Sequence, residues 1–326
     1  MKEKSYCTKN FKLFFTTIVT LLNISLFTSV GFATEFENLG NDPEINLDNS
    51  WFLTKIKAPT LWQSVPTGNI IKVLVCDTGI ESNHPDLKSN ISLPGQNFVD
   101  GSTHTEPTGN AHGTRIAGII GSIGIKGGAV GVNLNVHIIP GKISNDSTGK
   151  ALHVDTAKCI KWAADHAIRI VNVSFSGGLN EPIIHDAAKY LHDKGGILVM
   201  SAGNVWGRRE LPDDPYIIAV GMTTPSDWKT QFDSFGPFVD MVAPGVSIFT
   251  TDIGGKYLND KGSSLSAAVV SGAAALILSI RPNLTADELT EVLFRSTVDL
   301  GNPGRDEAFG VGRLDLSNTL NILNSF

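Results

Sequence analysis

Gly262-Ser263-Ser264-Leu265-Ser266-Ala267-Ala268 opens a run of small and apolar residues that continues to Leu278. No charged residue occurs from Ser264 until Arg281, which predicts a helix buried on nearly all sides. Its polar start argues against a membrane span. A serine at the mouth of a buried helix lies near free backbone N–H groups, which could hold a developing oxyanion. The alternative is an ordinary N-cap serine, because Ser is among the commonest N-caps.

On either side of this stretch, apolar runs typical of buried strands alternate with helical patterns. Strands are expected at 68–76, 136–139, 170–175, 196–200, 216–220 and 238–242. Helices are expected at 112–120, 154–168, 183–194 and 286–296, the last after a capping box that starts at Thr285. This rhythm predicts an α/β fold with a mostly parallel sheet, helices on both faces and a single domain.

The first 33 residues differ from the rest. Four lysines precede an apolar stretch at 14–32, which closes on Gly31-Phe32-Ala33. This layout predicts a secretory signal peptide, and the Thr, Asn and Ser residues within it disfavour the alternative of an uncleaved anchor helix. Residues 34–50 are expected to form a flexible lead-in or a short pro-segment, followed by the globular domain at 51–326. The protein is therefore expected to be secreted, extracellular or periplasmic, with no stable membrane partner.

Charge and cysteine content exclude several classes. A net charge of -6 with no Lys/Arg cluster argues against a nucleic-acid partner. Of the three cysteines, Cys7 lies in the expected signal, and we expect Cys76 and Cys159 to be free thiols. No His-Glu-x-x-His motif occurs and the other histidines are scattered, so we expect no metal and no cofactor.

Three candidate catalytic residues occur in the order Asp77, His112, Ser264. Asp77 follows an apolar strand, at the end where open α/β sheets form their crevices, and His112 begins a helical pattern. An α/β-hydrolase order is excluded because no histidine follows His192. A chymotrypsin-type order could use Asp240 or Asp260, but the alternation of strands and helices contradicts an all-β barrel. Asp-Thr-Gly is also an aspartic-protease signature, but it has no second copy.

Four motifs make the chain resemble the subtilisin-like serine proteases (subtilases, peptidase family S8) from Trp51 almost to its end. They are Asp77-Thr78-Gly79, His112-Gly113-Thr114, Ser201-Ala202-Gly203-Asn204 and Gly262-Ser263-Ser264. Each is weak alone, but the four stand in the family's order and rough spacing. The resemblance implies the family's α/β fold and a secreted serine endopeptidase that acts on polypeptide substrates, expected to be a monomer.

The resemblance also implies roles for individual residues. Ser264 would attack the scissile carbonyl, His112 would transfer the proton, and Asp77 would orient the imidazole. The Asn204 side chain and the Ser264 N–H would form the oxyanion hole. Substrate-binding residues would be Ser174, Phe175 and Ser176, whose backbone would pair with an extended peptide, and Val205, which hints at an apolar first specificity pocket.

Several positions depart from the family pattern. Ser263 replaces the usual Thr, and Ala268 the usual Pro. Arg115 replaces a second His and is expected to depress the basicity of His112. Ser176 replaces Gly, and the loop 123–128 lacks the side-chain oxygens of the family's calcium loop, so we expect no calcium there, while calcium elsewhere in the protein is left open. These departures leave two other hypotheses open: a catalytically weak binding or adhesion module, and a peptidase or esterase that acts on small substrates.

Overall fold

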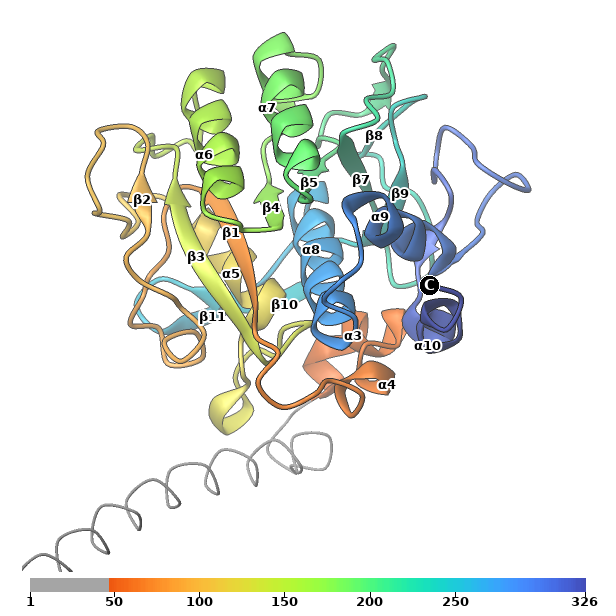
Figure 1. Ribbon diagram of the computed structural model, residues 1–326, viewed down its shortest axis with the longest axis horizontal. Coiled ribbons are helices and arrows are strands. Elements are labelled where there is room, and N and C mark those ends of the chain that lie inside the picture. The colour runs from red at the N-terminus through yellow and green to blue at the C-terminus, as the bar shows by residue number, and fades with distance from the viewer. Residues whose placement is uncertain (1–46) are drawn as a thin grey trace, which may run out of the picture. The chain divides into compact units, whose positions relative to one another are not determined.

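A nine-stranded sheet runs through residues 47–326, the part of the chain that this computed structural model describes (Figure 1). The expected signal peptide and most of the lead-in lie outside the described residues. The strands follow the order β12-β13-β9-β7-β5-β4-β1-β3-β2, and all neighbours are parallel except β12 and β13. The expected fold class, a mostly parallel sheet in an α/β fold, is confirmed.

The central strands are those that the apolar runs predict. They are β1 (Ile71–Asp77), β3 (Val136–Lys142), β4 (Ile170–Val173), β5 (Ile197–Ser201), β7 (Ile217–Thr223) and β9 (Met241–Pro244). The outer strands are short: β2 (Gln96–Asn97), β12 (Thr297–Val298) and β13 (Arg313–Leu314). A further pair, β6 (Gly207–Arg208) and β8 (Ser234–Phe235), lies outside this sheet. Nearly continuous burial along β1, β5 and β7 fits strands that are covered on both faces.

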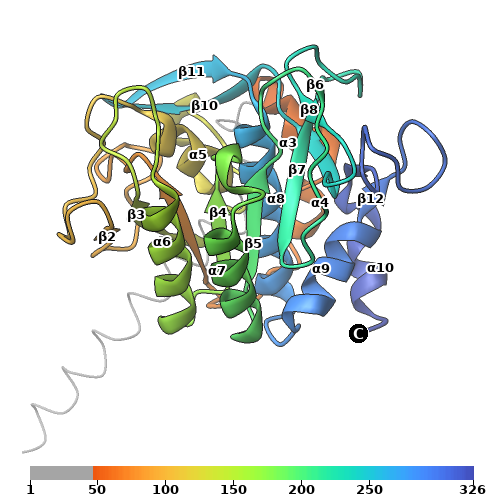
Figure 2. The same cartoon turned by 90° about the horizontal axis from the view of Figure 1, so that it is seen from above.

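Helices cover both faces of the sheet. Figure 2 shows α6 (His153–Asp165) and α7 (Pro182–Asp193) on one face, with α5 (His112–Gly121) and α8 (Ser263–Ile280) on the other. The remaining helices are shorter: α3 (Trp51–Ile56), α4 (Pro59–Trp62), α9 (Ala286–Arg295) and α10 (Thr319–Leu323). Single 3-10 turns occur at Leu47–Ser50, Ile125–Gly127, Ser176–Gly178 and Leu316–Asn318.

Helix α8 is the core of the molecule. Every residue from Ser263 to Ser279 is buried, as its lack of charge predicts. Among the described residues it is the one helix with the length and apolar character of a membrane span, yet 94% of it is buried inside the protein. Its small residues let neighbours approach closely: a Cβ on Gly272 would stand 2.7 Å from the Cβ of Val132.

A β-hairpin that the sequence patterns did not predict leads into α8. Strands β10 (Ile248–Asp252) and β11 (Lys256–Asp260) pair antiparallel beyond α5 (Figure 2). Asp260, the last residue of β11, is four positions before Ser264. The hairpin therefore sets the path of the chain into the start of α8.

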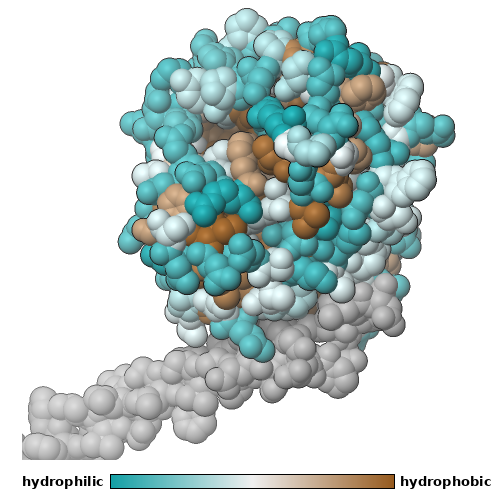
Figure 3. All heavy atoms as spheres, turned by 90° about the vertical axis from the view of Figure 1, so that its right-hand side faces the viewer, coloured by the Kyte–Doolittle hydropathy of each residue, from teal (hydrophilic) through white to brown (hydrophobic). Residues whose placement is uncertain are grey.

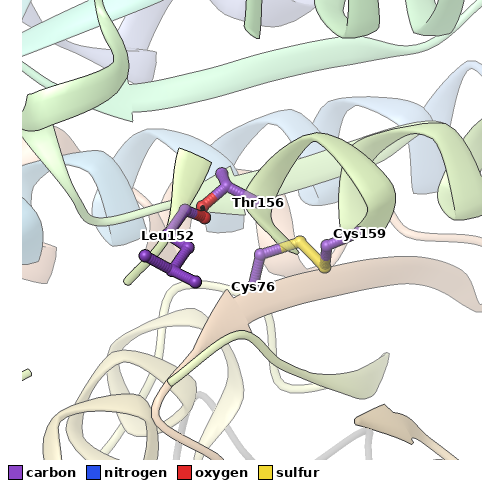
Figure 4. The surroundings of a disulfide bond; sticks show 4 residues. All are labelled: Cys76, Leu152, Thr156 and Cys159. Atoms are coloured by element: carbon purple, nitrogen blue, oxygen red, sulfur yellow. Dashed lines mark hydrogen bonds between the residues drawn. A yellow bond between two sulfur atoms is a disulfide. The ribbon is translucent and has the colours of Figure 1, made fainter. Parts of the chain in front are cut away.

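The expectation of two free thiols is wrong. Cys76, near the end of β1, and Cys159, on α6, form a disulfide with their Cα atoms 6.2 Å apart (Figure 4). Both residues are fully buried, and a Cβ on Gly141 would stand 2.6 Å from the Cys159 sulfur, so only glycine leaves room there. Strand and helix patterns predict the two elements but not which helix crosses which strand, and this crossing brings the two cysteines together.

Candidate active site

Asp77 and His112 meet at the carboxyl end of β1. The His112 Nδ1 atom lies 2.9 and 3.0 Å from the two carboxylate oxygens of Asp77. Asp77 is fully buried and also accepts a hydrogen bond from the Thr78 N–H at 2.7 Å. Helix α5 can start this close to β1 because residue 113 is glycine: a Cβ there would stand 2.3 Å from the Gly79 carbonyl oxygen.

The contact with Asp77 fixes the orientation of the imidazole. With Nδ1–H donating to the carboxylate, Nε2 of the neutral ring is left as a proton acceptor. Burial disfavours the charged ring, but the charge and hydrogen bond of Asp77, with the charge of Asp260, raise the pKa of His112 above its usual value. Arg115 lowers this pKa, as expected, but does not dominate it.

Ser264 is the second residue of α8, not its cap. The N-cap is Gly262, so the alternative of an ordinary N-cap serine is wrong. A buried chain of hydrogen bonds holds this end of the helix: Ser174 Oγ donates to the Ser264 carbonyl at 3.0 Å, and Asn172 Nδ2 donates to Ser174 Oγ at 3.0 Å. Ser271 Oγ in turn donates to Asn172 Oδ1 at 2.9 Å. Strand β4 is thereby fastened to α8 beside the serine.

Asn204 lies against the same helix start. Its Oδ1 atom accepts hydrogen bonds from the Ser263 N–H at 2.8 Å and the Ser263 hydroxyl at 3.0 Å. Because both bonds use Oδ1, the Nδ2 group of Asn204 is left to donate to another partner. A Cβ on Gly262 would stand 3.2 Å from Asn204 Nδ2 and 3.1 Å from Ser264 Oγ, so both groups border one small space. An amide donor beside a serine hydroxyl is an arrangement that can hold an oxyanion.

Phe175 connects the two halves of the site. Its ring packs edge-on against His112 at 6.1 Å between centroids, and its neighbour Ser174 binds Ser264. Helices α5 and α8 also pack directly on each other. Among the hydrogen bonds of residues 47–326, none joins His112 to Ser264.

The expected substrate-binding residues take different positions. Ser174 is buried and uses its hydroxyl in the core. Strand β4 ends at Val173, and Ser176 begins a 3-10 turn, so the expected strand 170–175 is shorter than predicted. Val205, directly after Asn204, is 71% exposed.

Sequence reasoning missed the groups around Arg115. Its Nε donates to Asp252 at 3.0 Å and its Nη1 donates to Asp260 at 2.9 Å. Strand alternation in 248–260, on both sides of Gly254-Gly255, was the available signal for the hairpin that carries these aspartates.

The loop 123–128 offers hydrogen-bond donors where a cation would need oxygen ligands. Asp86 is buried beneath it and accepts the Ile125 N–H at 2.7 Å. A Cβ on Gly128 would stand 2.0 Å from Asp86 Oδ2 and 2.8 Å from the Tyr257 hydroxyl. Burial raises the pKa of Asp86, partly offset by hydrogen bonds from Tyr257 and Ile125. Among the residues that the structure describes, no three His, Cys, Asp or Glu side chains gather into a group that could hold a metal ion, whereas calcium takes six to eight oxygen ligands.

Comparison with known proteins points to one family. The model of the subtilase family matches residues 68–312. The chain is 33% identical over 256 residues to subtilisin amylosacchariticus from Bacillus subtilis subsp. amylosacchariticus, covering 77% of this chain and 66% of that protein. It is 32% identical over 244 residues to thermitase from Thermoactinomyces vulgaris, covering 73% of this chain and 85% of that protein. The match thus spans just under two thirds of the subtilisin's length.

Two solved structures share the fold. A lanthipeptide protease matches with a TM-score of 0.73 over 84% of this chain and 94% of that one, at 24% identity. The epidermin leader peptide processing serine protease from Staphylococcus aureus matches with a TM-score of 0.71 over 87% of this chain and 83% of that one, also at 24% identity. At this identity the likeness concerns the fold.

Proposed function

Because the chain belongs to the subtilase family, we propose that it is a serine endopeptidase that hydrolyses peptide bonds through an acyl-enzyme formed on Ser264. The observation that carries the proposal is the contact between Asp77 and His112, in which both carboxylate oxygens lie within 3.0 Å of Nδ1. A buried carboxylate in this position selects the tautomer whose Nε2 can accept a proton from a serine.

In the proposed mechanism, Ser264 Oγ attacks the scissile carbonyl while His112 Nε2 takes its proton. The imidazolium, stabilised by Asp77, then gives the proton to the leaving amine. Water enters and repeats the sequence on the acyl-enzyme, which releases the second product and restores the serine. The oxyanion of each tetrahedral intermediate would accept hydrogen bonds from the Ser264 N–H and from Asn204 Nδ2.

We propose polypeptides as substrates. The side chains of Phe175 and Ser174 contact His112 and the Ser264 carbonyl, which supports the proposal that an extended peptide adds as a strand along the backbone at 174–176. Val205, exposed beside Asn204, is the proposed contact for the residue that precedes the cleaved bond.

Covalent labelling tests the nucleophile. A fluorophosphonate probe should label the wild-type protein on the peptide that contains Ser264, and labelling should disappear in Ser264→Ala and His112→Ala. Ser266→Ala serves as a matched control, because Ser266 lies on the same helix but donates its hydroxyl to Ala243 and Pro244. Labelling that persists in Ser264→Ala would exclude the proposed triad.

Substrate assays separate the alternatives. Casein hydrolysis supports the endopeptidase, and ester turnover without casein cleavage supports an enzyme for small substrates. A folded protein with neither activity supports a binding or adhesion module.

On the face shown in Figure 3, hydrophobic side chains gather in separate groups among polar ones.

We also propose that the protein is secreted. The disulfide between Cys76 and Cys159 supports this, because disulfides persist mainly in oxidising compartments outside the cytosol. N-terminal sequencing of the protein recovered from the culture medium should give a start soon after Ala33. Recovery from the cell fraction alone, with an intact N-terminus, would contradict secretion.

The surroundings of Asp86 support a proposal that this loop takes no calcium. Thermal unfolding should give the same Tm in EDTA and in millimolar calcium, for the wild type and for Asp86→Asn. A rise in Tm with calcium that disappears in Asp86→Asn would overturn the proposal that this loop takes no calcium.

A further inference from the structure

Arg115 joins the helix that carries His112 to the hairpin that leads to Ser264. It lies one turn after His112 on α5, and its guanidinium bridges Asp252 on β10 and Asp260 on β11. The three side chains are only 29%, 18% and 26% exposed, so water screens the two ion pairs less than it would on an open surface. Arginine suits this position, because its rigid fork can donate to two carboxylates at once.

Hydrogen bonds from β10 place the hairpin against the same turn of α5. Thr250 Oγ1 donates to the Arg115 carbonyl and Thr251 Oγ1 donates to the Thr114 carbonyl, both at 2.7 Å. A Cβ on Gly118 would stand 2.3 Å from Thr251 Oγ1, so the hairpin rests directly on the helix. Thr250 and Thr251 fix the strand nearer the helix, whereas Arg115 also reaches β11, whose end continues to Ser264.

The charges that face His112 come from three elements. Asp77 contacts it from β1, Asp260 acts from β11, and Arg115 acts from its own helix. The carboxylate of Asp252 on β10 forms an ion pair with the Arg115 guanidinium. Lys142 on β3, opposite Asp77 in the sheet, donates from its ammonium to the Glu106 carbonyl and to the Thr108 hydroxyl.

The other surroundings of His112 add no competing charge of this kind. Helix α8 has no charged residue. Lys261, just before it, places its ammonium 4.7 Å over the Phe232 ring. Without Arg115, both carboxylates of the hairpin would lose their partner, and the charge of Asp260 would act on the imidazole without opposition.

We propose that Arg115 is a positioning residue, which clamps the β10–β11 hairpin to α5 through Asp252 and Asp260 and offsets the negative charge that Asp260 presents to His112. The clamp keeps the strand that delivers Ser264 in register with the helix that carries His112. The charge keeps the imidazole neutral, and so able to accept a proton, at a lower pH than it otherwise would. The positioning role rests on the proposed function, whereas the charge role can be measured without turnover.

Titration of His112 by NMR tests the charge role in a Ser264→Ala background. His112 is one of eight histidines, and its signal is identified by its loss in His112→Ala. Arg115→Met should raise its midpoint by about half a pH unit, and Asp260→Asn should lower it by a similar amount. Arg115→Lys should leave it near the wild-type value, because the charge remains. Arg295→Met, which breaks an exposed pair with Glu291 on α9, is the matched control and should cause no shift.

Kinetics test the clamp. Arg115→Lys should lower kcat several-fold with little change in the acid limb of kcat/KM, because one ammonium cannot hold both carboxylates. The acid limb of Arg115→Met should move up in pH and that of Asp260→Asn should move down. If circular dichroism shows that Arg115→Met is unfolded, the Arg115→Lys and Asp260→Asn variants still test the two roles.

Two results would overturn the inference: shifts of the same sign in Arg115→Met and Asp260→Asn, or a wild-type titration in both. An unchanged kcat in Arg115→Lys would exclude the positioning role of Arg115 and leave its charge role standing. A wild-type protein that neither labels nor cleaves would refute the proposed function, and the titrations would still decide the charge role.

Discussion

Ser263 anchors Asn204 by two hydrogen bonds to the same carboxamide oxygen, one from its N–H at 2.8 Å and one from its hydroxyl at 3.0 Å. The same hydroxyl accepts the Gly203 N–H at 3.0 Å. The hydroxyl at position 263 therefore ties the loop that carries Asn204 to the start of α8. The family's usual threonine would supply the same group, which explains in physical terms why serine can stand there.

This contact predicts a graded series of variants. Asn204→Ala should lower kcat by about 10²- to 10³-fold, the loss found for one oxyanion-hole donor in a subtilisin. Ser263→Ala should lower it by a smaller factor, because the backbone N–H still holds Asn204, and Ser263→Thr should retain nearly full activity. Steady-state kinetics on a chromogenic peptide checks the order, and a Ser263→Ala enzyme as active as Ser263→Thr would contradict it.

Gly262 should be required for the open space beside the serine. In Gly262→Ala the new methyl would stand 3.1 Å from Ser264 Oγ and 3.2 Å from Asn204 Nδ2, so kcat should fall about 10²-fold. Gly68→Ala is the control: it also has a positive φ, but nothing lies within 4 Å of its Cβ position. Both variants should lose about 1 kcal/mol or more of stability, and only Gly262→Ala should lose turnover. Equal kcat values in the two variants would refute the steric explanation.

The disulfide should contribute to global stability. It closes a loop of 83 residues between β1 and α6, and the Cys76→Ser/Cys159→Ser protein should unfold with about 2–4 kcal/mol less free energy. Urea denaturation followed by circular dichroism measures this loss. Turnover at 25 °C should stay near the wild-type value, because Asp77 keeps its bonds to Thr78 and His112. A variant with wild-type stability would show that the crosslink does not constrain the chain.

Asp240 should make stability fall as the pH rises towards neutrality. Burial, opposed by a hydrogen bond from Ala219 N–H, raises its pKa to about 7, against 3.8 without the fold. The folded state then binds a proton that the unfolded state has lost. The resulting stability is fully present below about pH 4 and is lost as the pH rises through about 7.

The measurement is chemical denaturation of Asp240→Asn and wild type between pH 4 and pH 8. The variant should show a flatter dependence of unfolding free energy on pH in this window, while other groups contribute equally to both proteins. Parallel curves would mean that Asp240 is already ionised in the folded protein at low pH, held so by its contact with Arg305.

The sequence predicts the central elements well because each is a continuous apolar run or a helical pattern. Strand β1 was expected at 68–76 and lies at Ile71–Asp77, and α5 was expected at 112–120 and lies at His112–Gly121. Strand order and the crossing of α6 over β1 depend on contacts between distant segments, so no local pattern predicts them. The same holds for the pairing of Cys76 with Cys159. The hairpin at 248–260 is local, and the alternation on both sides of Gly254-Gly255 was a signal that the strand assignment did not use.

At the candidate site, motif order predicted that Asp77 joins His112 and that Asn204 joins Ser264. In the fold Asp77 contacts His112, and Asn204 is bonded to Ser263, the residue before Ser264. It did not predict what each partner does. Arg115 interpreted alone is a positive charge beside His112, whereas in the fold it is bound by two aspartates from the unpredicted hairpin. Ser174 was expected to pair with substrate through its backbone, and motif order gave no sign that its hydroxyl is buried and bonded to the Ser264 carbonyl.

The burial of α8 from its first residue onward links two rates that are independent in many enzymes. The amide hydrogens of its inner turns can exchange with deuterated water only when the whole core opens, because every residue from Ser263 to Ser279 is buried. Ser264, in the first turn of α8, loses its position in the same unfolding event. Under conditions in which every opening leads to exchange, loss of fluorophosphonate reactivity on heating should therefore proceed at the rate of exchange of these α8 amides, so that inactivation reports global unfolding of the molecule.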